Sequence, residues 1–246
     1  MKLYTFGCSN TAPYHELTKG YRDYKEYKGG SFPPIWPELL SKKLGYELVN
    51  YGQPGTGNDS IFYEFCKHVN EINKGDLVII GWTFVARYMW ADIQAKKWIH
   101  MCGERDTKDD VSFETHMQIM ERRMDEKTIP LFSDQIYMWI NLINRVANSV
   151  GFTVKYWSSD GDIVYPKYKE SSCDGLIFPC EGLTIKNVMT LFYVFDIVKM
   201  LGGERINEET NGEVDDAHWG VSGHEKVCEI FYKHINNNLN FTKALT

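Results

Sequence analysis

The sequence predicts a single α/β domain built around a parallel sheet, and three observations lead to this prediction. Strand-like runs recur along the chain with helical stretches between them, which is the pattern of βαβ units. Most of these runs are short and apolar, as strands buried on both faces should be. Glycine follows three of the helical stretches just before a strand, a common way for helices in such units to end.

These patterns give strands and helices in alternation. The expected strands are Lys2–Phe6, Tyr46–Asn50, Leu77–Gly81, Thr153–Trp157 and Leu176–Phe178. The expected helices are Pro34–Leu44, Asp59–Asn73, Ser133–Val150 and Ile185–Leu201. The first three helices are followed by Gly45, Gly75 and Gly151. The fourth helix is apolar on one face and is expected only to pack against the rest of the domain.

Residues 84–129 interrupt this alternation with a charged stretch that contains Met, His and Trp and has no strand character. We interpret it as an insertion after the third strand, at the carboxyl edge of the sheet, where open α/β folds bind ligands. It can serve as a lid or specificity element, or be a helical decoration or an oligomer contact. No repeat or linker divides the chain, so residues 1–246 are expected to form one domain.

The composition argues against several classes of partner. Lys and Arg number 27 against 33 Asp and Glu, a net charge of −6, and no basic block stands out. Nucleic-acid binding is not expected, because it depends on Lys and Arg contacts to phosphate. No apolar run approaches the roughly 18 to 20 residues of a membrane helix, so membrane insertion is not expected either.

The chain start and the cysteines indicate a cytoplasmic protein. The first residues lack the long apolar region of a signal peptide. The six cysteines form no C-x-x-C pair and no zinc-type spacing with histidine, so we expect mostly reduced thiols and no metal. Cys173 and Cys180 can also meet across a turn; the alternative is that both are ordinary small apolar residues. The sequence does not indicate an oligomeric state.

Ser9 is the first candidate for chemistry. It stands in the segment Gly7-Cys8-Ser9-Asn10-Thr11, on the turn directly after the first strand. Such a turn exposes a serine hydroxyl while the strand holds it in place, which suits a nucleophile. The common alternative is a serine that only caps or forms the turn.

A glycine-rich loop follows the second strand, from Asn50 through Gly52, Gly55 and Gly57 to Asp59. A phosphate-binding loop would need a Lys-Ser/Thr pair after its last glycine, and Asn58-Asp59 stands there instead. A backbone N–H of this loop could instead serve as an oxyanion donor beside Ser9, which requires close backbone approach. A plain loop with a helix cap is the remaining reading.

The third candidate lies near the C-terminus, in Asp215-Asp216-Ala217-His218 before a last helix. An acid three residues before a histidine can orient the imidazole through its Nδ1–H, while Nε2 faces a serine hydroxyl. A cluster of acids and a histidine can also bind a metal, but the sequence shows no third ligand at a suitable spacing. His224 is expected to be a helix-face residue or to support the site rather than act as the base.

Together, these three blocks resemble the SGNH (GDSL-like) hydrolase family. Its members carry Gly-x-Ser after strand one, Asn-x-Gly-x-x-Gly after strand two and Asp-x-x-His near the C-terminus. Here the blocks read Gly7-Cys8-Ser9, Asn50-Tyr51-Gly52-Gln53-Pro54-Gly55 and Asp215-Asp216-Ala217-His218. The block Gly7-Cys8-Ser9 joined to Gly81-Trp82-Thr83 after the third strand is also similar, more loosely, to divergent SGNH-like proteins of bacteria and phages, so a phage-encoded protein is compatible with the sequence.

The resemblance implies a three-layer, flavodoxin-like parallel sheet flanked by helices, and a set of roles. Ser9 would be the nucleophile, His218 the general base and Asp215 its orienting acid. The N–H groups of Ser9 and Gly55 would donate to the oxyanion, and no cofactor would be needed.

The chain departs from the family at its third block. The family's Gly-x-Asn-Asp is here Gly81-Trp82-Thr83-Phe84, so Thr83 falls where the asparagine would stand. Its hydroxyl can donate one hydrogen bond to an oxyanion, or Asn58 can reach the same place. Two smaller departures are Cys8 in place of an aspartate and Trp219 in place of a proline.

We therefore expect a serine esterase that hydrolyses short acyl esters, such as acetyl groups on a glycan. Four aromatic residues expected near the site would suit sugar stacking, although such residues are more often core: Tyr14, Trp82, Trp90 and Trp219. A catalytically impaired glycan-binding or assembly protein of the same fold is the main alternative. A nucleotide-binding protein that uses the glycine-rich loop is a third reading, although that loop lacks a basic residue.

Overall fold

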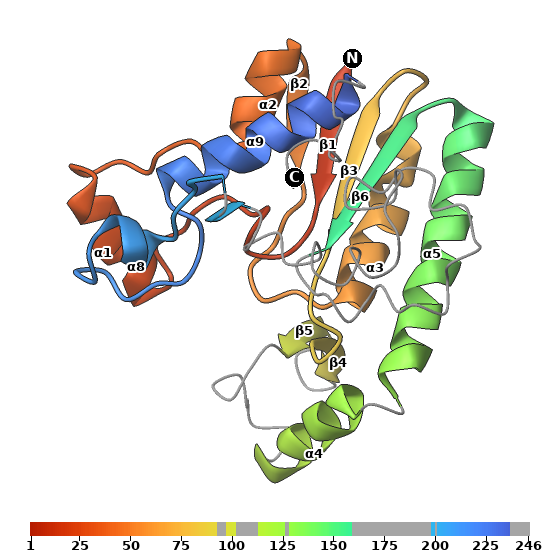
Figure 1. Cartoon of the computed structure of the whole chain (residues 1–246). Helices are drawn as coiled ribbons and strands as arrows, with labels where there is room; N and C mark the ends of the chain where they lie inside the picture. Colours follow the sequence, from red (N-terminus) through yellow and green to blue (C-terminus); the bar gives the residue numbers. More distant parts are fainter. Residues whose placement is uncertain (93–96, 102–112, 126–127, 159–197, 200, 237–246) are drawn as a thin grey trace, which may run out of the picture.

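The computed structural model describes the chain except for residues 93–96, 102–112, 126–127, 159–197, 200 and 237–246. Its centre is a four-stranded, all-parallel sheet in the order β2-β1-β3-β6 (Figure 1). The strands are β1 (Lys2–Phe6), β2 (Glu47–Asn50), β3 (Leu77–Trp82) and β6 (Thr153–Ser158). The α/β class and the parallel sheet are thus confirmed.

Three parts of the sequence prediction fall outside the described residues. They are the expected strand Leu176–Phe178, nearly all of the expected helix Ile185–Leu201, and the pair Cys173 and Cys180.

Helices lie on both faces of the sheet (Figure 1). One face carries α2 (Trp36–Leu44) and α9 (Val221–Ile235), and the other carries α3 (Asn58–His68) and α5 (Ile129–Val150). A short 3₁₀ turn, η1 (Val69–Glu71), continues α3. The expected glycine stops are seen at Gly45 and Gly151, which end α2 and α5 in the left-handed conformation, at φ 69° and 92°.

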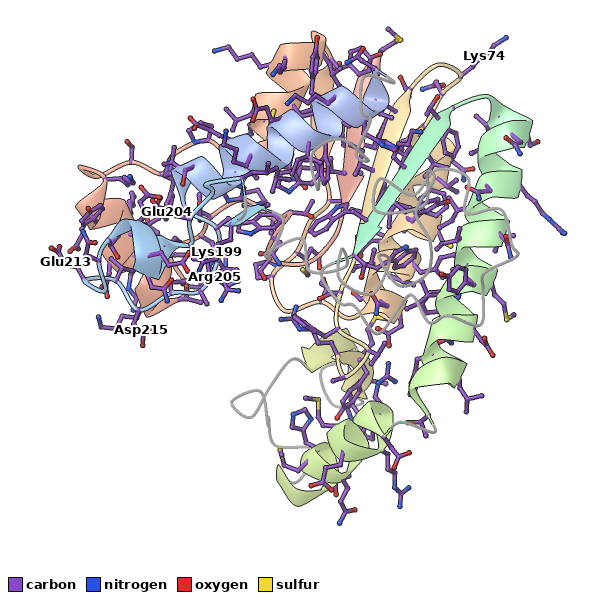
Figure 2. The ribbon with its side chains drawn as sticks, viewed as in Figure 1. Lys74, Lys199, Glu204, Arg205, Glu213 and Asp215 are labelled. Carbon is purple, nitrogen blue, oxygen red and sulfur yellow. The ribbon has the colours of Figure 1, made fainter. Side chains whose placement is uncertain are left out.

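A small unit that the sequence did not reveal packs beside the first strand's carboxyl end. It consists of α1 (Lys19–Tyr27), the short α8 (Ile206–Glu209) and the loops around them (Figures 1 and 2). Tyr21 and Tyr24 share one face of α1 and pack with Ile206 and Val214. Segments about 185 residues apart in the chain therefore share a satellite core, which local patterns cannot show.

The insertion at 84–129 contains strands, contrary to expectation. β4 (Tyr88–Asp92) and β5 (Lys97–Met101) form an antiparallel ribbon, followed by α4 (Phe113–Met124). The ribbon and α4 lie beyond the carboxyl edge of the main sheet, as expected for the insertion (Figure 1). The strands were missed because the apolar residues of β4 are consecutive and show no alternation; pairing with β5 makes it a strand.

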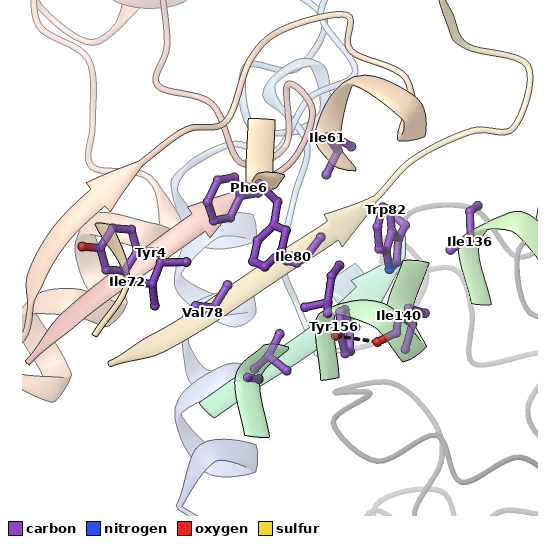
Figure 3. Close-up of a cluster of buried hydrophobic side chains, with 14 of the residues drawn as sticks. Tyr4, Phe6, Ile61, Ile72, Val78, Ile80, Trp82, Ile136, Ile140 and Tyr156 are labelled. Carbon is purple, nitrogen blue, oxygen red and sulfur yellow. Dashed lines mark hydrogen bonds between the residues drawn. The ribbon is translucent and has the colours of Figure 1, made fainter. Parts of the chain in front are cut away.

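The main core explains why the central strand reads as an unbroken apolar run. All six residues of β3 are buried, because helices cover both of its faces. Figure 3 shows the side that packs under α3 and α5, where Phe6, Val78 and Ile80 meet Ile61 and Ile140. The opposite side packs under α2 and α9 around three fully buried tryptophans, Trp36, Trp157 and Trp219.

Glu209 joins the α1–α8 unit to the last helix. Its Oε2 accepts hydrogen bonds from the Tyr24 hydroxyl at 3.0 Å and from the backbone N–H of Val221 at 2.8 Å. Its Oε1 forms an ion pair with Lys28. Since Val221 is the first residue of α9, the carboxylate also meets the positive end of that helix.

We predict that Glu209→Ala lowers the free energy of unfolding by about 2 kcal/mol, because Tyr24, Val221 and Lys28 all lose a partner. Urea denaturation of the variant and the wild type measures the difference. Glu213→Ala is the matched control, since Glu213 is an exposed acid of the same unit. Equal losses in the two variants would contradict this role for Glu209.

Candidate functional site

Ser9 lies on a tight turn at the carboxyl end of β1. The carbonyl of Cys8 accepts hydrogen bonds from the N–H groups of Thr11, at 2.8 Å, and Ala12, at 3.0 Å, which closes the turn around Ser9. Ser9 is half-buried. Among the described residues, neither its hydroxyl nor its backbone N–H has a hydrogen-bond partner. The rigid turn therefore presents both groups at the sheet edge.

Asn50 fixes this turn to the end of β2. Its Oδ1 accepts hydrogen bonds from the Thr5 hydroxyl at 2.9 Å and from the N–H of Gly52 at 2.8 Å. Its Nδ2 donates to the carbonyl of Thr11 at 2.8 Å. One amide side chain thus joins β1, the serine turn and the glycine-rich loop.

The glycine-rich loop lies directly against the serine turn. A Cβ on Gly52 would stand 2.7 Å from the backbone nitrogen of Ala12, so a side chain is excluded there. The N–H of Gln53 donates to the carbonyl of Gly7 at 2.9 Å. Gly55 is half-buried with a φ of 73°, and its N–H has no acceptor within the described part of the chain.

Asp216, and not the predicted Asp215, is the partner of His218. Asp216 Oδ1 lies 2.7 Å from His218 Nδ1 and also accepts the backbone N–H of His218 at 2.8 Å. A carboxylate acceptor places the proton on Nδ1 and leaves Nε2 as an acceptor. Burial acts to raise the pKa of Asp216, but the hydrogen bond and charge of His218 lower it overall.

Asp215 is exposed at the outer edge of the α1–α8 unit (Figure 2). The N–H of Asp216 donates to the carbonyl of Val214 at 3.1 Å, so the backbone turns at Asp215. The side chain of His218 is 36% exposed against 10% for Asp216. The imidazole is therefore accessible while its acid is covered.

Trp36 links the serine turn to the last helix. Its indole Nε1–H donates to the carbonyl of Asn10 at 2.8 Å, and its backbone N–H donates to His224 Nδ1 at 3.2 Å. A second link runs from the Tyr14 hydroxyl to the carbonyl of Trp219 at 2.8 Å. The turn that carries the predicted nucleophile and the segment that carries the predicted base therefore lie at one sheet edge.

Tyr21 stands at the side of the His218 ring. Their ring centroids lie 5.2 Å apart, and the ring of His15 lies 5.0 Å from Tyr21 on another side. Burial lowers the pKa of His15, and the nearby charge of His218 lowers it further. No hydrogen bond joins Ser9 to His218, both of which lie in the described part of the chain.

His224 is a structural residue, in agreement with the expectation that it is not the base. It is buried, and burial lowers its pKa to about 3, so the ring is neutral near pH 7. Its Nδ1 is occupied as the acceptor for Trp36. A base needs an accessible nitrogen, which this ring does not offer.

At the third block, Thr83 is enclosed rather than exposed. Asn58 pairs with it in both directions: its Nδ2 donates to the Thr83 carbonyl, and its Oδ1 accepts the Thr83 N–H, each at 2.7 Å. The Thr83 hydroxyl accepts from Arg87 Nη1 at 3.2 Å, and the residue has no measurable exposure. Asn58 therefore braces both backbone groups of Thr83.

Two of the aromatic residues considered for sugar stacking belong to the core. Trp82 and Trp219 are each 1% exposed, so neither offers a ring face to a sugar. Tyr14 and Trp90 are half-buried.

Sequence reasoning missed Tyr21, His15, Asp216 and Arg87. The sequence did offer Asp216, because it lies two residues before His218 and directly after the predicted Asp215. The other three act through tertiary contacts that no spacing marks.

No protein-family model matches this chain, and no curated protein matches it. Within the described residues, no group of three or more His, Cys, Asp or Glu side chains is arranged to hold a metal ion. In the same part of the chain, no helix is long and apolar enough to cross a membrane.

We predict that His224 makes folding sensitive to acid. Its pKa is about 3 in the folded protein and about 6.5 in an unfolded chain, so between these values the unfolded chain binds the extra proton. Stability is therefore full above about pH 6.5 and falls as the pH drops below it. His224→Asn keeps an acceptor for Trp36 but removes this titration.

Urea midpoints between about pH 7.5 and about pH 5 measure the effect, above the range in which carboxylates titrate. The midpoint of the wild type should fall more steeply than that of His224→Asn. Parallel slopes would show that His224 does not cause the acid sensitivity.

Proposed function

We propose that this protein is a serine esterase of the SGNH hydrolase type, with a flavodoxin-like three-layer fold. Ser9 is the nucleophile, His218 the general base and Asp216 the acid that orients it, in place of Asp215. The Asp216–His218 pair carries the proposal, because a covered acid on Nδ1 leaves Nε2 of an accessible imidazole ready to accept a proton. The links through Trp36 and Tyr14 support it by holding the two segments at one edge.

The proposed reaction proceeds through an acyl-enzyme. His218 Nε2 takes the proton of Ser9, whose Oγ bonds to the ester carbonyl carbon. The oxyanion accepts hydrogen bonds from the N–H groups of Ser9 and Gly55. The C–O bond to the alcohol then breaks as His218 returns the proton to the leaving oxygen, and water, activated by His218, releases the acid.

The free protein lacks the Ser9–His218 hydrogen bond that this reaction uses. Catalytic hydrogen bonds are often long or absent in free enzymes and form when substrate binds. The proposal requires no metal or organic cofactor.

The substrate proposed is a short acyl ester, such as an acetyl group on a glycan, in a cytoplasmic or phage-encoded setting. With Trp82 and Trp219 in the core, a sugar would have only the half-buried Tyr14 and Trp90 to contact among the aromatic residues considered.

A non-catalytic glycan-binding or assembly protein of the same fold is the second candidate. The enclosed Thr83, in the place where the family has an asparagine, favours it, because an exposed donor is missing at that position. Under this reading, changing Ser9 would leave every measurable property of the protein intact.

We predict that a fluorophosphonate probe labels the wild type and that Ser9→Ala and His218→Ala abolish labelling. Asp216→Asn should reduce p-nitrophenyl acetate turnover by a factor on the order of 10³ to 10⁴, because the imidazole loses its orienting acid. Asp215→Asn is the matched control and should keep wild-type turnover. A well-folded wild type without labelling would favour the binding protein, and equal losses at 215 and 216 would refute the assignment of the acid.

We also predict a preference for short acyl chains. Turnover of p-nitrophenyl acetate should exceed that of the octanoate ester, and an acetylated sugar should release acetate. Kinetics with a series of chain lengths measure this preference. Turnover of long-chain esters alone would rule out the proposed substrate class while leaving the serine chemistry in place.

A further inference from the structure

Arg87 is held firmly at the carboxyl edge of the sheet. Its N–H donates to the carbonyl of Phe84 at 3.2 Å, and its own carbonyl accepts from Arg123 Nη2 at 3.2 Å. A Cβ on Gly57 would lie 2.7 Å from that same carbonyl oxygen, so the glycine-rich loop packs against it. The backbone of Arg87 is thus fixed from three directions.

The Arg87 side chain is also oriented. Nη1 donates to the Thr83 hydroxyl at 3.2 Å, and the guanidinium lies 5.2 Å from the centre of the Phe84 ring. Arg87 is half-buried while Thr83 beneath it is enclosed. Of Thr83 and Arg87, only Arg87 is therefore exposed enough to contact a bound molecule.

The strand register places this group beside the nucleophile turn. Phe6 of β1 pairs with Ile80 of β3, so Ser9 and Thr83 each stand three residues beyond a matched pair. The close approach continues past the pair, since a Cβ on Gly7 would lie 3.3 Å from the carbonyl of Gly81. The guanidinium bound to Thr83 consequently lies at the same edge as Ser9.

The positive charge of Arg87 has no anionic partner among the described residues. No described carboxylate lies within ion-pair distance of it. Only one of its five N–H donors has an acceptor in that part of the chain. A fixed, half-buried cation with spare donors suits negative charge that develops during a reaction.

We propose that Arg87 is the third oxyanion donor of the site, in place of the asparagine that the resemblance leads one to expect. This inference rests on the proposed esterase function. When Ser9 Oγ bonds to the carbonyl carbon, the C=O π pair moves onto oxygen, and an Arg87 N–H donates a hydrogen bond to it. No proton leaves Arg87, and the pair returns to the C=O bond when the alcohol departs.

The test compares Arg87→Gln and Arg87→Lys with Arg122→Gln, the matched control, which removes an exposed arginine of α4. With p-nitrophenyl acetate, Arg87→Gln should lower kcat by about 100-fold or more with little change in KM, as for loss of an oxyanion donor. Arg87→Lys keeps the charge and should recover part of the loss. Arg122→Gln should match the wild type, and thermal unfolding verifies that each variant is folded.

The outcomes separate the two proposals. Labelling of wild-type Ser9 with unchanged kcat in both folded Arg87 variants would overturn the role of Arg87 alone. A rise in KM confined to esters that carry a carboxylate would also overturn it, because Arg87 would then bind the substrate's own charge. Absence of wild-type labelling would overturn the esterase proposal itself.

Discussion

The arrangement of the candidate site depends on Trp36, which hydrogen-bonds in two directions from the start of α2. The indole Nε1–H donates to the carbonyl of Asn10, one residue after Ser9. The backbone N–H donates to Nδ1 of His224 on α9. Both contacts are buried, so each lost bond would leave an unsatisfied polar group in the core. Trp36 and His224 are 188 residues apart in the chain, and through these two bonds Trp36 holds the serine turn and the last helix together.

That constraint also determines what the two histidines near the C-terminus can do. His224 points inward, where burial keeps it neutral and its Nδ1 is committed to Trp36. His218 stands before the helix begins, where the loop is open enough to expose the ring but close enough for Asp216 to cover Nδ1. The contrast between the two rings, one buried and one accessible, arises from their positions in the fold.

The sequence was sufficient to predict the strands of the sheet because most of them are short apolar runs. It was also sufficient for two helix ends, where Gly45 and Gly151 adopt a left-handed conformation. The sequence was insufficient where contacts between distant parts of the chain determine the structure. Two aspartates stand side by side at 215 and 216, and only the backbone path of the loop selects between them. The α1–α8 unit was missed because its residues gain a buried face only from partners elsewhere in the chain. The β4–β5 ribbon was missed for a local reason, since the apolar residues of β4 are consecutive and show no alternation.

The surroundings of Thr83 show how one enclosed residue determines what its neighbours contact. Its side chain has no measurable exposure. Asn58 braces both backbone groups of Thr83: its Nδ2 donates to the Thr83 carbonyl, and its Oδ1 accepts the Thr83 N–H. The threonine hydroxyl instead serves as an acceptor that orients the guanidinium of Arg87. Under the role proposed for Arg87, the inserted segment after β3 would be part of the reaction machinery rather than a cover over it.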